Sequence, residues 1–197
     1  TGDIRVKQYR SKAGALFCFA VDASGSMALH RMRQAKGAVQ SLLQQAYVKR
    51  DRVALIAFRG EQAEILLPPS QSVELAQRAL DLLPTGGGTP LASALLLATD
   101  VASQAKMRGI FQTVLVLLTD GRANVGLTAE SDVARDLEQI GRFVAESPLH
   151  VIVVDTQRKY LSRGEARRLA EYLGGDYAYL PTASGEEIAQ LVTSNTT

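Results

Sequence analysis

Oxygen-bearing side chains alternate directly after the first apolar run of the chain. Residues 15–21 are continuously hydrophobic, and Asp22, Ser24 and Ser26 follow with only small residues between them. An Asp-x-Ser-x-Ser array at the end of a strand places three oxygen side chains on one tight loop. Mg²⁺ takes hard oxygen ligands at about 2.0–2.1 Å, so this loop is a candidate site for a divalent cation.

Two further oxygen side chains downstream can reach the same place. Thr89 follows a run of three glycines, and Asp120 follows the apolar run 113–119. In a doubly wound sheet, ligands bind outside the carboxyl ends of the strands, where the strand order reverses. With the strand order 3-2-1-4-5-6, Asp22 and Asp120 end neighbouring strands. Taken singly, each of these residues also suits a helix cap or a turn, and only their combination indicates a metal site.

Apolar runs and helical patterns alternate along almost the whole chain. This alternation predicts a doubly wound α/β fold, with helices on both faces of a mostly parallel, six-stranded sheet. Only a short connection separates residues 52–58 from 63–67, which predicts a hairpin and one antiparallel edge strand. The predicted strands are 15–21, 52–58, 63–67, 113–119, 149–155 and 176–179. The predicted helices are 27–46, 72–82, 90–105, 131–146, 163–173 and 185–193, with Ser72, Thr89 and Ser162 as candidate N-caps.

The composition indicates an ordinary globular domain. Of the 197 residues, 46% are hydrophobic and 21% are charged, so the chain can bury a core of its own. The net charge of +2 is too small to predict nucleic-acid binding. Cys18 is the single cysteine, which excludes an internal disulfide and favours a reducing compartment. No apolar stretch approaches the roughly 20 residues that span a bilayer.

The organisation of the chain is simple. We expect one domain over residues 14–197, preceded by a polar and basic lead-in over residues 1–13. The sequence shows neither an internal repeat nor a low-complexity stretch. It starts at Thr1 rather than at a methionine, which leads us to expect a piece of a longer protein.

The five oxygen side chains resemble, element by element, the metal-ion-dependent adhesion site of von Willebrand factor A domains, also called integrin I domains. In that family the serines and the threonine bind Mg²⁺ directly or through water, and a carboxylate of a partner protein completes the coordination shell. The resemblance implies Mg²⁺ as the cofactor, with Mn²⁺ as a substitute. It implies as metal ligands Asp22, Ser24, Ser26, Thr89 and Asp120.

Residues beside this site are candidates for contact with a partner. Basic side chains near the metal would dock an acidic surface, although they suit a solvated face equally well. The glycines lie next to Thr89. The candidates are Arg31, Arg33, Gly87, Gly88 and Arg122.

Longer stretches are similar to the carboxy-terminal domain of the D subunit of magnesium chelatase. They are residues 10–14, 35–39, 47–60, 66–70, 83–91 and 120–124. In that family an ATP-dependent complex inserts Mg²⁺ into protoporphyrin IX on the way to chlorophyll and bacteriochlorophyll. The resemblance implies an Mg²⁺-dependent interaction domain that contacts an AAA+ ATPase subunit and a porphyrin-binding catalytic subunit. It also implies the bacterial cytoplasm or the chloroplast stroma as the location.

The motifs point to a binding module rather than to an enzyme. A magnesium-dependent phosphohydrolase needs a second carboxylate two residues after its nucleophile, and Ser24 stands there. The sequence contains neither a Gly-x-Ser-x-Gly elbow nor a phosphate-binding Gly-x-x-x-x-Gly-Lys motif. Two alternatives stay open at this point: an equivalent domain of a cobalt chelatase or another AAA+-coupled machine, and, in a different class, a magnesium-dependent phosphohydrolase.

Overall fold

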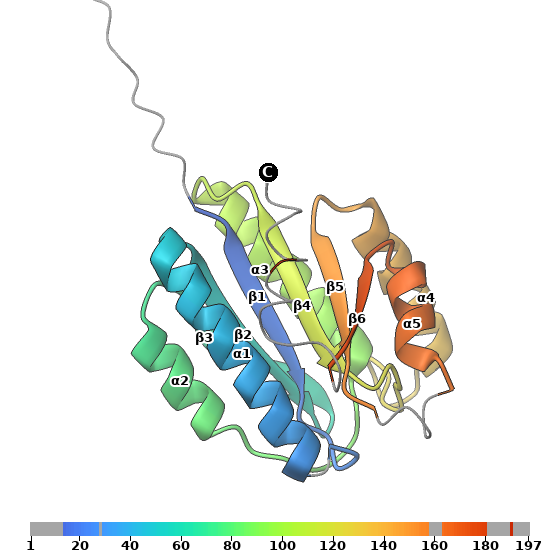
Figure 1. The fold of residues 1–197 in the computed structure, drawn as a ribbon. Coiled ribbons are helices and arrows are strands. Elements are labelled where there is room, and N and C mark those ends of the chain that lie inside the picture. Colours follow the sequence, from blue (N-terminus) through green and yellow to red (C-terminus); the bar gives the residue numbers. More distant parts are fainter. Residues whose placement is uncertain (1–13, 28, 158–162, 181–189, 191–197) are drawn as a thin grey trace, which may run out of the picture.

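The computed structural model describes residues 14–27, 29–157, 163–180 and 190. They form a sheet with helices on both faces (Figure 1), which confirms the predicted fold class. The strands are β1 (Leu16–Asp22), β2 (Arg52–Arg59), β3 (Gln62–Ser70), β4 (Thr113–Thr119), β5 (His150–Asp155) and β6 (Asp176–Tyr179). The helices of this part of the chain are α1 (Leu29–Lys49), α2 (Val73–Asp81), α3 (Leu91–Met107), α4 (Val133–Glu146) and α5 (Glu165–Tyr172).

The strands lie in the order β3-β2-β1-β4-β5-β6, as the sequence predicts. Neighbouring strands are parallel except β2 and β3, which form the predicted antiparallel hairpin at one edge. β1 lies between β2 and β4, with Asp22 opposite Phe58 and Val21 opposite Leu118. The carboxyl ends of the parallel strands therefore meet at one edge of the sheet.

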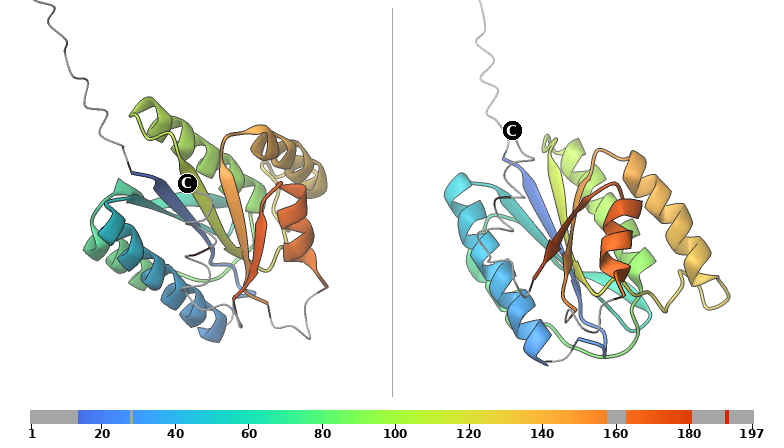
Figure 2. Two further views of the ribbon diagram at one scale, coloured as in Figure 1. Left: turned by 45° about the horizontal axis from the view of Figure 1, so that its top comes forward. Right: turned by 45° about the vertical axis from the view of Figure 1, so that its right-hand side comes forward.

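Separate hydrophobic layers cover the two faces of the sheet. Helices α1 and α2 pack on one face, and α3, α4 and α5 pack on the other (Figures 1 and 2). Successive side chains of β1 enter alternate layers: Phe17 and Phe19 pack toward α1, whereas Leu16 and Cys18 pack toward α3. A strand buried on both faces needs apolar residues at every position, which explains the unbroken hydrophobic run of β1.

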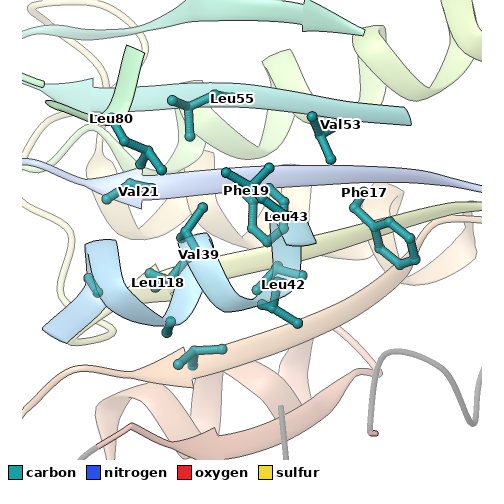
Figure 3. Close-up of a cluster of buried hydrophobic side chains, with 14 of the residues drawn as sticks. Phe17, Phe19, Val21, Val39, Leu42, Leu43, Val53, Leu55, Leu80 and Leu118 are labelled. Carbon is teal, nitrogen blue, oxygen red and sulfur yellow. The ribbon is translucent and has the colours of Figure 1, made fainter. Parts of the chain in front are cut away.

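Figure 3 shows the layer under α1 and α2. Phe19 of β1 is 1% exposed and lies among Leu55 of β2, Leu43 of α1 and Leu80 of α2. These contacts hold the middle of β1 on one face of the sheet, and the second hydrophobic layer holds it on the other face. The strand is thereby held rigidly up to its last residue, Asp22. Among the described residues no helix is long and apolar enough to cross a membrane.

The ends of several elements differ from the prediction. Thr89 is not the N-cap of α3: Pro90 takes that position without a side-chain hydrogen bond, and the Thr89 carbonyl accepts the Leu91 N–H at 3.0 Å. This frees the Thr89 side chain for another role. Ser72 does cap α2, since its hydroxyl accepts the Leu75 N–H at 3.2 Å.

The edge strand β3 is longer than predicted, and it continues through two prolines. Pro68 and Pro69 lack an N–H, yet a strand at the edge of a sheet needs ladder hydrogen bonds on one side only. The pairing of β3 with β2 shifts register near these prolines. Ser162, the predicted helix over residues 185–193 and the predicted lead-in over 1–13 lie outside the described residues, apart from residue 190.

The central position of Phe19 leads to a stability prediction. Phe19→Ala should lower the free energy of unfolding by about 3–5 kcal/mol, because it leaves a cavity in a fully buried layer. Phe111→Ala is the matched control: Phe111 is 73% exposed, so its loss should cost less than about 1 kcal/mol. Urea denaturation of both variants measures the difference. Equal destabilisation by the two substitutions would contradict this description of the core.

Candidate metal site

Two acidic side chains are delivered to the same edge by neighbouring central strands. Asp22 is the last residue of β1, and Asp120 directly follows β4. β1 and β4 pair in parallel, so the two carboxyl groups lie side by side at the point where the strand order reverses. Both are buried, at 0% and 2% exposure. The pairing of these strands is therefore what creates the candidate site.

The metal loop, residues 22–27, folds back over the Asp22 carboxylate. The Ser24 N–H donates to Asp22 Oδ1 at 2.9 Å, and the Met27 N–H donates to the Ser24 carbonyl at 3.1 Å. This tight turn brings the hydroxyl oxygens of Ser24 and Ser26 to 3.0 Å from each other. Ser24 is buried and Ser26 is exposed, so the loop presents its oxygens from the interior out to the surface.

The glycine loop, residues 84–90, lies against the metal loop. Two backbone hydrogen bonds join them: the Gly86 N–H donates to Ala23 O at 2.8 Å, and the Gly25 N–H donates to Gly87 O at 2.9 Å. Gly87 has a φ of 79°, and a Cβ there would stand 2.8 Å from the Cα of Gly60. A larger residue would push the glycine loop away from the turn between β2 and β3. This packing brings the buried Thr89 to the carboxyl edge of the sheet.

Asn124 holds the glycine loop from the other side, and the sequence reasoning missed it. Its Oδ1 accepts the Thr89 N–H at 2.7 Å, and its own N–H donates to the Thr89 carbonyl at 3.3 Å. Both polar groups of the Thr89 backbone are thus fixed by one residue. An asparagine in a loop carries no pattern of its own, so only the three-dimensional pairing identifies it.

Thr119 links Asp22 at the end of β1 to the turn after β4 that carries Asp120. The sequence reasoning missed this residue too. Its hydroxyl donates to Asp22 Oδ2 at 3.2 Å and accepts the Gly121 N–H at 3.1 Å. The residue is fully buried at the end of β4. In the sequence it is a β-branched residue that ends a strand, which gives no hint of a polar role. Its hydrogen bonds orient one carboxylate and the turn that carries Asp120.

The electrostatics of the site favour a bound cation. Burial and, to a smaller extent, the nearby Asp120 charge raise the pKa of Asp22 to about 6, despite the opposing effect of hydrogen bonds from Ser24 and Thr119. A divalent ion would offset the repulsion between the two carboxylates. Among the described residues, no three or more His, Cys, Asp or Glu side chains are grouped so that they could hold a metal ion. Carboxylate and hydroxyl oxygens suit Mg²⁺ or Mn²⁺.

The predicted partner-contact residues do not share one environment. Arg31 lies at the site itself, with Nη1 3.9 Å from Asp120 Oδ2. Arg33 is exposed. Arg122 forms an ion pair with Glu165 at 3.6 Å, and its N–H donates to Asp120 Oδ1 at 3.1 Å. The glycine loop contributes Gly87, which is exposed, and Gly88, which is partly exposed. Contact of these five residues with a partner stays a prediction.

Comparison with known proteins identifies the class to which this fold and this grouping of side chains belong. The family model of the von Willebrand factor type A domain matches residues 17–122, more than half of the chain, and this range includes all five predicted ligands. The chain belongs to this family. The solved structure of the von Willebrand factor domain of the pilus tip protein Mfa5 from Porphyromonas gingivalis has the same fold. Its TM-score is 0.71 at 13% identity, with 94% of this chain and 97% of that chain covered.

Relatives of higher identity belong to a narrower group. The chain is 55% identical to the magnesium-chelatase 67 kDa subunit of Chlorobaculum parvum, with 98% of this chain and 33% of that protein covered. It is 43% identical to the magnesium-chelatase 60 kDa subunit of Cereibacter sphaeroides, with 96% and 34% covered. These matches confirm the resemblance predicted from the sequence. The chain spans about a third of the length of these relatives.

The raised pKa of Asp22 predicts a pH-dependent stability in the presence of EDTA. Between its usual pKa, 3.8, and about 6, the folded protein keeps a proton on Asp22 that the unfolded chain has released. Stability should therefore fall as the pH rises through this window and level off above it. Denaturation at about pH 4 and pH 7.5 should show wild type losing roughly 2 kcal/mol more than Asp22→Asn. Parallel losses in the two proteins would contradict the assignment.

The hydrogen bonds of Asn124 predict an effect on metal binding. Asn124→Ala removes the acceptor of the Thr89 N–H, so Mn²⁺ affinity should fall about tenfold or more, as is usual when a residue that orients a ligand is removed. Asn124→Asp keeps an acceptor for the Thr89 N–H and should retain more affinity than the alanine variant. Titration followed by the EPR signal of free Mn²⁺ measures both. Unchanged affinity in Asn124→Ala would show that Asn124 does not position Thr89 for the metal.

Proposed function

We propose that this chain is an Mg²⁺-dependent protein–protein interaction domain of a magnesium chelatase subunit. The observation that carries the interaction role is the grouping of two buried carboxylates and the hydroxyls of the metal loop at one edge of the sheet. The assignment to magnesium chelatase is supported by 55% identity over 98% of the chain to a subunit of that name. The two lines of support are independent, because one rests on the site and the other on the whole sequence.

The burial of the ligands supports a direction for partner binding. Asp22, Ser24, Thr89 and Asp120 are buried, whereas Ser26 is exposed. A bound Mg²⁺ would supply a coordination position that a carboxylate can fill. That position would lie on the Ser26 side, because the sheet edge closes the opposite side. An aspartate or glutamate of the partner would then form a charge-assisted contact.

The hydroxyl ligands give such a contact its strength. Ser24, Ser26 and Thr89 are neutral, so they bind the cation without cancelling its charge. Asp22 and Asp120 supply at most two negative charges. The Ser24 N–H and the Thr119 hydroxyl already donate hydrogen bonds to the carboxylate oxygens of Asp22. With both carboxylates ionised, the two charges of Mg²⁺ are balanced, so a further anionic oxygen would be bound through the open coordination position of the cation. This Mg²⁺ would be part of the domain, distinct from any Mg²⁺ that a chelatase inserts as its substrate.

The partners follow from this assignment. An AAA+ ATPase subunit and a porphyrin-binding catalytic subunit of the same complex are the proteins that this domain would connect, in the bacterial cytoplasm or the chloroplast stroma. The names of the relatives at 43–55% identity specify magnesium, which favours magnesium over cobalt as the inserted metal. The buried Ser24 stands where a phosphohydrolase of this arrangement needs its second carboxylate, which favours binding over hydrolysis.

Removal of the metal ligands tests this proposal. The variant with both Ser24→Ala and Ser26→Ala should bind the ATPase subunit of a magnesium chelatase at least about tenfold more weakly than wild type in Mg²⁺, and EDTA should weaken wild type equally. Ser103→Ala, an exposed serine on α3, is the matched control and should bind normally. Biolayer interferometry measures affinity, and circular dichroism checks the fold. Wild-type affinity in the double variant would rule out a metal-bridged contact.

A further inference from the structure

The side chain of Arg31 reaches from the first turn of α1 into the candidate metal site. Its Nη1 lies 3.9 Å from Asp120 Oδ2, and its Nη2 donates a hydrogen bond to the carbonyl oxygen of Ser26. Only 18% of the side chain is exposed. The guanidinium is therefore held between the metal loop and the carboxylate that ends β4, and it is part of the site rather than of an open basic surface.

Local helix energetics do not explain an arginine at this position. The amino-terminal end of a helix carries partial positive charge, so a cation in the first turn is unfavourable there. The first turn of α1 contains no acidic residue that would compensate. The contact with the buried Asp120 is the interaction that offsets this cost. Arg33 stands two positions further along α1 and is exposed, because residues separated by two positions do not share a helix face.

We infer that Arg31 is a tethered cation that competes with the divalent metal for Asp120 and thereby sets the metal affinity of the site. This inference rests on the proposed metal site. A guanidinium about 4 Å from Asp120 and a metal bound by the same carboxylate would repel each other strongly at partly buried positions. The metal must therefore displace the guanidinium or share Asp120 with it, and either event weakens metal binding.

The competition has a consequence for the kind of ion that binds. Arg31 already supplies one positive charge to a site with two carboxylates, Asp22 and Asp120. An ion that replaces this contact must interact with the carboxylates better than a singly charged guanidinium does. A divalent cation meets this condition because of its higher charge and its short distances to oxygen. Arg31 thus prevents the binding of ions that interact with these carboxylates more weakly than its own guanidinium does.

Substitution of Arg31 tests the inference on the isolated chain. Arg31→Gln should bind Mn²⁺ about three- to tenfold more tightly than wild type, because the competing charge is gone. Arg31→Lys keeps a cation near Asp120 and should stay closer to wild type. Arg33→Gln is the matched control for the loss of one positive charge from α1 and should leave the affinity unchanged. Titration followed by the EPR signal of free Mn²⁺ gives the dissociation constants.

A second readout separates competition from a general change in charge. In EDTA, thermal unfolding of Arg31→Gln should occur at a lower temperature than that of Arg33→Gln, because Asp120 loses its counter-charge. Saturating Mn²⁺ should remove this difference. Equal or weaker Mn²⁺ binding by Arg31→Gln, with wild type binding normally, would overturn the role of Arg31 alone. Failure of wild type and all variants to bind Mn²⁺ would overturn the metal site and, with it, this inference.

Discussion

The closeness of two buried carboxylates is the constraint on which the site depends. Asp22 and Asp120 end neighbouring strands, and each loses most of its contact with water. Desolvation and the neighbouring Asp120 charge oppose ionisation of Asp22. The surrounding groups reduce this cost: the Ser24 N–H and the Thr119 hydroxyl donate to Asp22, and the Arg31 guanidinium lies near Asp120. A bound cation, as proposed, would reduce this cost further.

The rest of the domain keeps this arrangement rigid. β1 packs between two hydrophobic layers, which fixes the position of its last residue, Asp22, at the edge of the sheet. The glycine loop is tied to the metal loop by its backbone, and Asn124 fixes the Thr89 backbone from the opposite side. The predicted ligands thus come from three loops, yet each loop is anchored to a strand or to another loop. Such preorganisation would let a metal bind without a large loss of conformational entropy.

Much of this could be predicted from the sequence, because the fold depends on local patterns. Unbroken apolar runs identify strands buried on both faces, and the short connection at residues 59–62 identifies the hairpin. The placement of Asp22 and Asp120 at the ends of such runs was enough to predict that they meet. The interpretation of Thr89 as a helix cap was wrong because a hydroxyl before a proline looks like a helix start, whereas backbone contacts with Asn124 set its position.

The contacts that tune the site could not be predicted in the same way. Thr119 with Asp22, Asn124 with Thr89, and Arg31 with Asp120 each join residues that are far apart in the chain. No periodicity or spacing relates such partners, and each residue taken alone has an ordinary explanation as a strand end, a loop polar group or a solvated cation. Their roles become visible only when the strand order brings the partners together.

The central claim is that the oxygens of the metal loop, Thr89 and Asp120 bind one divalent cation. Anomalous X-ray diffraction from crystals of the domain grown with Mn²⁺ tests it most directly. The account predicts one strong anomalous peak at the carboxyl edge of the sheet, with at least two of the Ser24, Ser26 and Thr89 hydroxyls about 2.0–2.3 Å from it. Well-ordered crystals at saturating Mn²⁺ with no peak between β1 and β4, or with a peak held only by surface carboxylates elsewhere, would contradict it.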